Sequence, residues 1–350
     1  MRKSGVVWVN IQMIKVQCER PFQFRVLNCE PISRGQGEVL VRVKRVGICG
    51  TDFHAYRGEQ PLVTYPRVLG HEVAGVVEDV DSGASPFSTG EVVCLFPYRS
   101  CGNCKACLRG KPNCCRALDV IGVTSDGGMS ELISVPESQL VSCNGLDLDQ
   151  AVIVEPLSIA AHAVRRASVS NGDHVLVIGA GPIGIAVARL AALRGAHVYI
   201  TDLRRDRLEA AAQWCGPDHV NVIPGDISLQ VTRDLTAGDM MEIVFDATGN
   251  KQSMEFALQY VGHGGRLALV GIVQDSLCYP HPEIHKRELT LLSCRNALRE
   301  DFQYVIELMR NKKIAVDGYI THRAMLCDVK HVWTEWELSM RNMVKGVFEV

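Results

Sequence analysis

The pattern of apolar positions divides the chain into two regions of different character. Between residues 24 and 135, short alternating runs of Val, Ile and Leu are separated by Gly, Pro and Asp, as in QGEVLVRVKRVG and EVAGVVEDVDSG. Runs of this length bounded by turn residues are typical of β-strands. The sequence therefore predicts an irregular β-rich domain in the first part of the chain.

Residues 173–293 show a second pattern, in which the apolar runs are short and nearly continuous. These runs are DHVLVIG, AHVYITD, HVNVIPG, MEIVFDATG, GRLALVG and ELTLLSC, and helical stretches such as IGIAVARLAALRG and SMEFALQYVGHG separate several of them. Strands that are apolar on both faces and alternate with helices indicate a parallel sheet covered by helices. We therefore predict a doubly wound parallel sheet of six strands, with ELTLLSC at an edge that needs cover.

The remaining segments suggest how the two regions are connected. A further helix is predicted in REDFQYVIELMRNKK, and mixed short elements then lead to KGVFEV at the C-terminus. We expect an α/β chain with a β-rich domain in residues 1–160, a doubly wound domain in 161–294 and a return to the first domain in 295–350. Residues 1–12 precede the first predicted strand and are interpreted as an N-terminal extension.

Composition and charge exclude several classes of protein. The 350 residues include 37 Lys and Arg against 39 Asp and Glu, a net charge of −2, which argues against a dedicated nucleic-acid or anionic-membrane binder. The longest apolar stretch, residues 175–188, is shorter than the roughly 18 residues that a membrane span requires, and the N-terminus lacks the features of a secretory signal. We expect a cytoplasmic protein.

A glycine motif connects the first strand of the doubly wound region to its first helix. It has the order G-x-G-x-x-G and consists of Gly179, Gly181 and Gly184. The first glycine permits a tight turn, the second lets the backbone approach a pyrophosphate, and the third allows close helix packing. Asp202, at the end of the next strand, can accept hydrogen bonds from ribose hydroxyls. The motif predicts NAD, while Arg204 and Arg205 nearby leave NADP as an alternative.

Fourteen cysteines are many for this chain, and without a secretion signal they are expected to stay reduced. Four of them have the spacing C-x2-C-x2-C-x7-C: Cys101, Cys104, Cys107 and Cys115. Four thiolates can close a tetrahedron around a structural zinc ion, although reduced thiols without a metal are the alternative. Eight scattered cysteines are expected to be small core residues: Cys18, Cys29, Cys94, Cys143, Cys215, Cys278, Cys294 and Cys327.

A second set of possible metal ligands is dispersed over three short motifs. GICGTDFH contains Cys49, Thr51 and His54, LGHE contains His71 and Glu72, and VEP contains Glu155. Each of these residues alone is more often structural than a ligand. Together they offer a thiolate, an imidazole and carboxylates with one position left for water or substrate, which suits a catalytic zinc ion.

With these motifs in one order, the chain resembles the zinc-dependent medium-chain dehydrogenases, the superfamily of alcohol, sorbitol and threonine dehydrogenases, from about Met13 onwards. The resemblance implies a Rossmann domain inserted in a GroES-like catalytic domain, with NAD and two zinc ions per subunit. It assigns Cys49 and His71 to the catalytic zinc. Glu155 matches the family's carboxylate near the metal and Glu72 is a ligand or close neighbour in the polyol branch, so both stay candidates.

The resemblance also concerns Cys114, which is adjacent to Cys115, and the cofactor. The family spacing excludes Cys114 from the four-cysteine site. Besides the three glycines and Asp202, the expected cofactor contacts are Pro182, Ile183, Arg207, Thr248, Val270 and Gly271.

Longer local matches, including VGICGTDFHAYRGEQP and EIHKRELTLLSCRNA, look most like bacterial sugar-acid dehydrogenases. They imply reversible hydride transfer between NAD and a secondary alcohol of an L-galactonate-like acid. In this family Thr51 would take the alcohol proton and His54 would relay it to solvent, unless His54 is only an exposed loop residue. Arg295 is our first candidate for binding the substrate carboxylate, and Lys286 and Arg116 are the next candidates. Alternatively, Arg295 has a surface or interface role.

Three other functions are compatible with parts of the pattern. A neutral-polyol dehydrogenase would differ only in its pocket, and an NAD(H)-binding regulator would keep the fold without turnover. A zinc-ribbon nucleic-acid module is poorly supported because the cysteine loop lies in a nearly neutral chain. A homodimer or homotetramer acting on a small polyhydroxy substrate is expected, with neither nucleic acid nor membrane as a partner.

Overall fold

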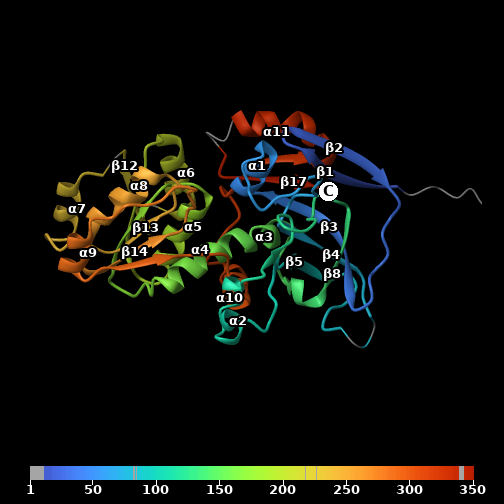
Figure 1. Cartoon of the computed structure of the whole chain (residues 1–350), viewed down its shortest axis with the longest axis horizontal. Helices are drawn as coiled ribbons and strands as arrows, with labels where there is room; N and C mark the ends of the chain where they lie inside the picture. Colours follow the sequence, from blue (N-terminus) through green and yellow to red (C-terminus); the bar gives the residue numbers. More distant parts are fainter. Residues whose placement is uncertain (1–11, 82, 84, 217, 226, 339–342) are drawn as a thin grey trace, which may run out of the picture.

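The computed structural model of the chain describes residues 12–81, 83, 85–216, 218–225, 227–338 and 343–350. Its strands form two large sheets that lie in separate lobes, and helix α4 (Val154–Arg166) runs between the lobes (Figure 1). The predicted combination of a β-rich domain and a doubly wound domain is confirmed. The boundary predicted at residue 160 falls inside α4, and residues 1–11 of the predicted extension lie outside the described part of the chain.

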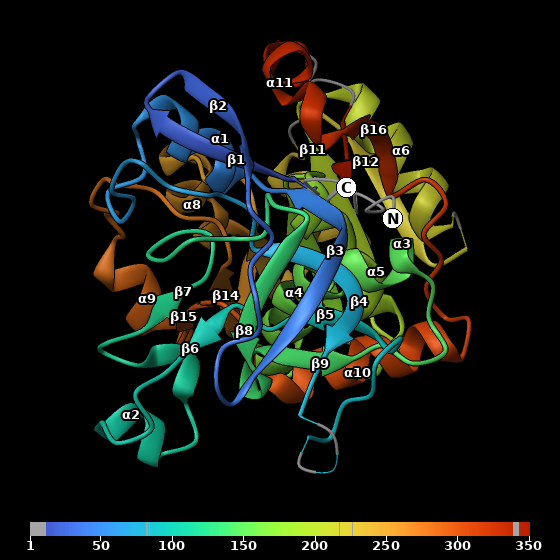
Figure 2. The same ribbon diagram turned by 90° about the vertical axis from the view of Figure 1, so that its right-hand side faces the viewer.

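The sheet of the first lobe has seven strands, six in its main path and one beside it, and Figure 2 shows several of them side by side. Their order is β16 (Ile320–Met325), β17 (Lys345–Glu349), β3 (Glu38–Ile48), β4 (Glu72–Asp79), β5 (Val92–Leu95) and β9 (Leu140–Ser142), and β8 (Leu132–Pro136) also pairs with β3. The C-terminal segment therefore completes a sheet that the N-terminal part begins, because β17 pairs antiparallel with β3. Apolar side chains from β3, β4 and β17 form the core beneath it.

Smaller elements surround this sheet. They are the hairpin β1 (Met13–Arg20) and β2 (Gln23–Cys29), the ribbon β6 (Tyr98–Arg99) and β7 (Asp119–Val120), and the helices α1 (Gly50–Arg57), α2 (Lys105–Leu108), α3 (Leu148–Val152) and α11 (Val329–Leu338). Trp333 of α11 is buried against Phe24 and Phe53, so aromatic packing attaches this helix to the first lobe.

The second lobe contains a parallel sheet of six strands, as the apolar runs predict. Its order is β12 (Val220–Pro224), β11 (His197–Asp202), β10 (His174–Ile178), β13 (Met241–Asp246), β14 (Val261–Leu269) and β15 (Thr290–Ser293). The chain turns from one half of the sheet to the other between β10 and β13, the point where doubly wound sheets bind nucleotides. The helices of this lobe are α5 (Pro182–Ala192), α6 (Arg205–Cys215), α7 (Leu229–Leu235), α8 (Lys251–Phe256) and α9 (His281–Arg287).

Three expectations about local structure need correction. The predicted helical stretch SMEFALQYVGHG ends early, because β14 already begins at Val261 and pairs with β13. A helix at residues 329–338 was not predicted, since its apolar face packs on aromatic residues distant in sequence. Of the eight scattered cysteines, Cys278 and Cys327 are exposed and Cys29 and Cys294 are half-buried, so only the other four are core residues.

None of the described helices combines the length and the apolar composition needed to cross a membrane.

The helix predicted after the sixth strand is α10 (Arg299–Arg310), which packs against α4 at the junction of the two lobes.

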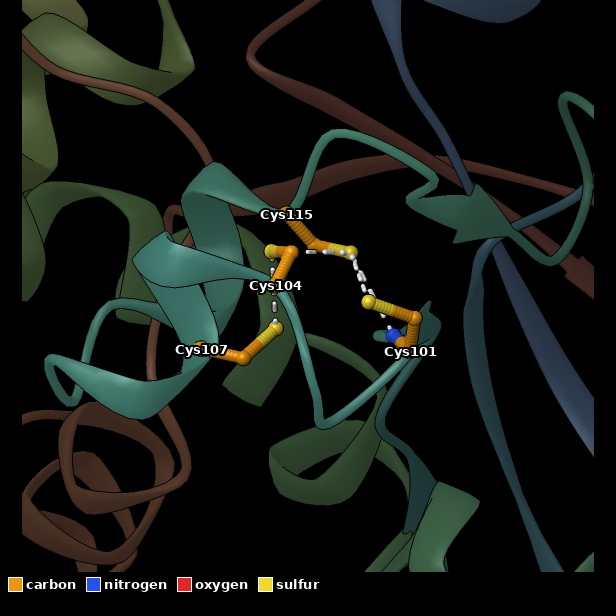
Figure 3. A group of neighbouring side chains, drawn as sticks. All are labelled: Cys101, Cys104, Cys107 and Cys115. Atoms are coloured by element: carbon orange, nitrogen blue, oxygen red, sulfur yellow. Dashed lines mark hydrogen bonds between the residues drawn. The ribbon is translucent and has the colours of Figure 1, made fainter.

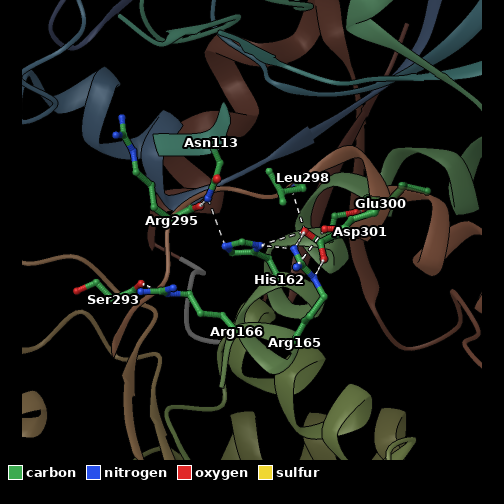
Figure 4. A network of polar contacts seen from close by, with 11 residues as sticks. Asn113, His162, Arg165, Arg166, Ser293, Arg295, Leu298, Glu300 and Asp301 are labelled. Carbon is green, nitrogen blue, oxygen red and sulfur yellow. Dashed lines mark hydrogen bonds and ion pairs between the residues drawn. The ribbon is translucent and has the colours of Figure 1, made fainter. Parts of the chain in front are cut away.

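A buried polar network ties α4 to α10 (Figure 4). The Asp301 carboxylate accepts hydrogen bonds from Arg165 Nε at 2.8 Å and from the Leu298 backbone N–H at 2.8 Å, and it lies 3.1 Å from His162 Nδ1. Burial raises the pKa of Asp301, but the bonds to His162 and Arg165 outweigh burial and lower it below its usual value. The carboxylate is therefore held ionised between the two helices.

We expect Asp301→Asn to lower the free energy of unfolding at neutral pH by about 2 to 3 kcal/mol, the usual size of a charge-assisted hydrogen-bond loss. Because the folded-state pKa is lowered, the contribution is complete above the unfolded carboxyl pKa of about 3.9 and disappears as the pH falls through the folded value. Urea unfolding of both proteins at several pH values measures this difference.

Arg205→Ala is the matched control, because Arg205 forms an exposed ion pair with Glu209. Its removal should change stability by less than about 1 kcal/mol. A stability difference between wild type and Asp301→Asn that stays constant down to the acid limit would contradict the ionised state of Asp301.

Candidate active site

Strand pairing brings the segments of the dispersed ligand set together. In the antiparallel register of β3 and β4, Gly47 pairs with Glu72, so the end of β3 lies beside the start of β4. Cys49 follows β3 directly and precedes α1, while His71 precedes β4. The two predicted ligands therefore lie at the same edge of the sheet although 22 positions separate them in the chain.

Three of the predicted ligands form one group. Cys49, His71 and Glu72 each offer a ligand atom, and these atoms all lie within 4.8 Å of one another. His71 and Glu72 are buried and Cys49 is half-buried. A thiolate, an imidazole nitrogen and a carboxylate oxygen at this separation suit zinc, which has bond lengths of about 2.0 to 2.3 Å to such atoms.

Asp52 supports this group from behind. Its buried carboxylate accepts hydrogen bonds from the backbone N–H groups of Cys49 at 2.9 Å and Gly70 at 3.3 Å, and lies 3.8 Å from His71 Nδ1. Burial lowers the pKa of His71, but the charge of Asp52 and the contact with Cys49 raise it well above its usual value. A carboxylate behind the imidazole is the arrangement found where the other ring nitrogen binds a metal.

Glu155 lies apart from the three-residue group. It projects from the first turn of α4, it is buried, and its carboxylate accepts a hydrogen bond from the Tyr98 hydroxyl. Burial, together with the charge of Glu72, raises the pKa of Glu155 to about 7, although the charge of His71 opposes this shift. The structure therefore brings Glu72 rather than Glu155 next to Cys49 and His71, with Glu155 within electrostatic reach.

The two residues of the predicted proton path differ in their surroundings. Thr51 Oγ1 lies 3.8 Å from Cys49 Sγ, at the site itself. His54 is one turn further along α1, and its Nδ1 lies 2.8 Å from Glu59 Oε2 in an ion-pair geometry in which both side chains are about half exposed. His54 is therefore a solvent-accessible histidine with a carboxylate beside it.

The four cysteines of the second set converge around α2, which contains Cys107 and directly follows Cys104 (Figure 3). Their sulfur atoms lie 3.5 Å apart for Cys104 and Cys107, 4.0 Å for Cys104 and Cys115, and 3.4 Å for Cys101 and Cys115. A regular zinc tetrahedron with bonds of about 2.3 Å places its sulfur atoms about 3.8 Å apart. The geometry therefore fits a zinc ion with four protein ligands and no open position, and Cys114 is exposed.

The thiols of this group also have shifted pKa values. Backbone N–H groups of Cys107 and Arg116 lower the pKa of Cys104 to about 6, whereas burial and neighbouring thiols raise that of Cys107 to about 11. Crowded sulfur atoms cannot all ionise without a compensating charge, and a divalent cation supplies that charge.

Gly179, the first glycine of the motif, and Asp202 line a cavity of about 560 Å³ at the carboxyl ends of the parallel strands. Its lining includes Gly179, Asp202, Arg207 and Thr248. The Asp202 carboxylate accepts a hydrogen bond from the Ala180 backbone N–H at 2.8 Å and lies 3.7 Å from the Arg207 guanidinium. A carboxylate at this position can bind ribose hydroxyls and would repel a 2′-phosphate. The Arg207 guanidinium beside it carries the opposite charge.

The glycines have different roles in this cavity. A Cβ at Gly184 would lie 1.8 Å from the Gly179 carbonyl oxygen, so the helix can approach the strand only with glycine there. A Cβ at Gly181 would meet its nearest atom, in Arg207, at 4.0 Å. Gly181 therefore leaves open space in front of the N-terminus of α5, where backbone N–H groups can bind a pyrophosphate.

The other predicted cofactor residues lie at the start of α5 or in the loop after β14. Pro182 and Ile183 begin α5, and Val270 and Gly271 follow β14. A Cβ at Gly271 would lie 2.5 Å from the Gly249 nitrogen, which brings the loop after β14 against the loop that contains Thr248.

Arg295 follows β15 and is exposed. Its backbone carbonyl accepts a hydrogen bond from Asn113 Nδ2 at 2.9 Å, and Asn113 also lies 3.3 Å from His162 Nε2. In Figure 4 the guanidinium of Arg295 points away from this network. The structure thus fixes the backbone of Arg295, while its guanidinium has no hydrogen-bond or ion-pair partner among the described residues.

Several residues of the site were not found from the sequence. Asp52, Tyr98 and Lys345 contact the predicted ligands, and Asn113 contacts the segment of Arg295. Asp52 lies within GICGTD and Asn113 lies between Cys107 and Cys115, but neither residue was identified there as part of the site. For Tyr98 and Lys345 the only signal is their spatial position, which depends on strand pairing.

Two family models match the chain, the alcohol dehydrogenase GroES-like domain over residues 35–145 and the zinc-binding dehydrogenase over residues 182–311. The L-galactonate-5-dehydrogenase of Escherichia coli K12 is 38% identical over 330 residues, which cover 94% of this chain and 97% of the relative. The 2-dehydro-3-deoxy-L-galactonate 5-dehydrogenase of Pseudoalteromonas atlantica is 32% identical and covers 91% of this chain and 94% of its own length.

A solved structure is similar over nearly the whole chain. It is a short chain alcohol dehydrogenase, RspB, from Escherichia coli CFT073 in complex with NADH, with a TM-score of 0.89 and 31% identity, covering 97% of this chain and 99% of that one.

We expect Cys104→Ser to reduce the zinc content of the purified protein from two ions per chain to one, because one of four thiolates is lost. Cys114→Ser should leave two, because the Cys114 side chain is exposed and outside the group of four. Elemental analysis of both proteins after gel filtration measures the content. Equal zinc loss in the two variants would show that the adjacent cysteines exchange roles.

Proposed function

Because this chain belongs to the zinc-dependent medium-chain dehydrogenase family, which the two matching domains and the 38% identical relative establish, we propose that it oxidises a secondary alcohol of a sugar acid with NAD. It is an oxidoreductase of the polyol and sugar-acid dehydrogenase type. The observation that carries the proposal is the convergence of Cys49, His71 and Glu72 at one end of the sheet, in a chain that also has a nucleotide cavity.

Cys49 and His71 would hold the catalytic zinc ion, with Glu72 or Glu155 beside it, and the four-cysteine loop would hold the structural one. When bound, zinc makes an alcohol hydroxyl acidic near neutral pH and nicotinamide accepts the hydride. The negative charge of Asp52, 3.8 Å from His71 Nδ1, favours a proton on that nitrogen and so would leave the other ring nitrogen for the metal. The residues therefore supply a fixed pair of ligands on a rigid strand edge.

Thr51 is proposed to take the alcohol proton, because its hydroxyl can donate and accept and lies 3.8 Å from Cys49 Sγ. His54 then passes the proton to solvent, which agrees with its exposure and with Glu59 2.8 Å from Nδ1. Glu59 stabilises the Nδ1–H tautomer and leaves Nε2 as the proton acceptor.

For the nucleotide, Gly181 and the N-terminus of α5 would bind the pyrophosphate, and Asp202 the adenosine ribose. NAD is favoured over NADP because the Asp202 carboxylate faces the cavity. The NADH in the similar RspB structure supports the same choice.

We further propose the division into residues 1–160, 161–294 and 295–350, a cytoplasmic location, and pairing of subunits as a homodimer or homotetramer. Pairing along β15 is supported by its position at the end of the sheet and by Leu291, which is 37% exposed on that edge strand.

The proposed function predicts NADH formation when the purified protein is given NAD and aldonic acids of the L-galactonate type. Cys49→Ser should reduce turnover by about a thousandfold or more, since a lost Lewis acid removes several kcal/mol of transition-state stabilisation. The absorbance of NADH across a panel of acids and neutral polyols provides the measurement.

The panel separates the alternatives. Faster turnover of sorbitol-like polyols than of any acid would identify a neutral-polyol dehydrogenase, and tight NADH binding without turnover of any member would identify a regulator. Cys114→Ser is the matched thiol control and should retain full activity.

Arg295→Leu tests the acid specificity. If the guanidinium binds the substrate carboxylate, KM for the acid should rise by about tenfold to a hundredfold, the equivalent of a charge-assisted hydrogen bond. KM for a neutral polyol should change by less than about threefold, because no such bond is lost. Initial-rate kinetics with both substrates decides the question, and equal effects on the two would remove Arg295 from the pocket.

A further inference from the structure

The hydroxyl group of Tyr319 is buried at the boundary between the two lobes. Tyr319 lies between α10 and β16, in the segment through which the chain returns to the sheet of the first lobe. The residue is 0% exposed, and its hydroxyl donates a hydrogen bond to the Pro182 backbone carbonyl at 3.2 Å. Pro182 is the first residue of α5. A residue of the returning segment therefore contacts the N-terminus of the helix that is proposed to bind the pyrophosphate.

Further contacts fix this segment against the same two helices of the second lobe. The centroids of the Tyr319 and Trp214 rings lie 4.9 Å apart, and Trp214 Nε1 donates a hydrogen bond to the Ala315 carbonyl at 2.9 Å. Arg189 of α5 donates another to the Lys313 carbonyl, also at 2.9 Å. The segment around Tyr319 is therefore held on α5 and α6 by contacts that do not involve the hydroxyl.

The surroundings of the Tyr319 hydroxyl keep it protonated. Burial raises its pKa well above the usual value for tyrosine, and the negative charges of Glu72, Glu155 and Cys49 raise it as well. A protonated phenol can donate a hydrogen bond, and a backbone carbonyl can only accept one. Tyr319 is therefore the donor to Pro182 at neutral pH, in a position within electrostatic reach of the proposed metal ligands.

The carbonyl that Tyr319 contacts shares a peptide unit with the Ile183 N–H. In a planar trans peptide the C=O and the N–H point in opposite directions, so a donor on the Pro182 carbonyl fixes the direction of the Ile183 N–H. The same bond polarises the peptide and makes that N–H a stronger donor. Ile183 lies in the first turn of α5, where N–H groups have no acceptor within the helix and can bind an anion.

We propose that Tyr319 is a positioning residue for the cofactor, which holds the Pro182–Ile183 peptide so that the Ile183 N–H faces the pyrophosphate of NAD. This inference rests on the proposed nucleotide site. It adds to the glycine motif a residue from a distant part of the chain. Because the segment of Tyr319 continues into β16, one side chain connects the pyrophosphate site to the sheet that carries the proposed metal ligands.

The inference predicts a selective loss of affinity in Tyr319→Phe, which keeps the ring and removes only the hydroxyl. The fold should survive, because in a helix the Pro182 carbonyl also accepts a bond from the N–H four residues further on. The Kd values of NADH and ADP should rise by about threefold to tenfold, the equivalent of one neutral hydrogen bond. The Kd of adenosine should change by less than about twofold, because adenosine has no phosphate.

The binding experiment uses the fluorescence of NADH. Titration gives the Kd of NADH for each purified holoprotein, and displacement of NADH gives the Kd values of ADP and of adenosine. Tyr56→Phe is the matched control, because it removes a phenol hydroxyl that donates to the Phe22 carbonyl at 3.0 Å in the first lobe. This variant should have the same three Kd values as the wild type.

The amide signal of Ile183 tests the orientation of the peptide without any ligand. The sequence contains Pro followed by Ile at residues 31–32 and 182–183. Labelling proline at its carbonyl carbon with ¹³C and isoleucine with ¹⁵N therefore selects the amides of Ile32 and Ile183 in carbonyl-correlated NMR spectra. In Tyr319→Phe the Ile183 signal should move, because the polarisation of its peptide changes, and the Ile32 signal should stay in place.

Several results would overturn the inference. They are an unchanged Kd of ADP in Tyr319→Phe, an Ile183 signal that does not move, or equal rises in the Kd values of NADH, ADP and adenosine, which a general loss of packing would cause. Failure of the proposed nucleotide site has a different signature, because the wild-type protein would then bind neither NADH nor ADP. Binding by the wild type with no effect of Tyr319→Phe would overturn only the role of Tyr319.

Discussion

The antiparallel pairing of β3 with its neighbours β4 and β17 is the constraint on which the site depends. Opposite strand directions bring the end of β3 next to the starts of β4 and β17, as the pairs Gly47 with Glu72 and Gly346 with Ile48 show. The proposed ligands and Lys345 come from positions next to these pairs. A register shift of one residue would turn Glu72 to the other face of the sheet and leave the cation of Lys345 without its partner.

Charge balance explains why so polar a site can be buried. Asp52, Glu72 and Glu155 are each at most 4% exposed, and the buried ammonium group of Lys345 pairs with Glu72. Burial raises the pKa values of Asp52 and Glu155, as expected for anions that are removed from water. A divalent cation would relieve this excess of acidic groups, so the donor set and its electrostatics favour the same occupant.

The sequence predicts best what local pattern determines. The six strands of the parallel sheet and the turn at Gly179 and Gly181 follow from apolar runs and glycine spacing, both properties of neighbouring residues. The two cysteine-containing sets were found because residue type and motif were sufficient. Tyr98 and Lys345 could not be found in this way, because each becomes part of the site only when strands far apart in the chain pair.

Helix α4 connects the features that sequence patterns left separate. Its first turn carries Glu155 within electrostatic reach of the proposed metal ligands, and two turns later it carries His162, which contacts both Asp301 of α10 and Asn113 of the cysteine loop. Asn113 in turn holds the backbone of Arg295 at the exit from the parallel sheet. The cysteine loop is poor in apolar residues, and a metal ion bound to its four thiolates would order it. The cysteine loop therefore affects more than its own stability. Through Asn113 it holds the segment of Arg295, the proposed substrate-binding residue, against α4, the helix that carries Glu155.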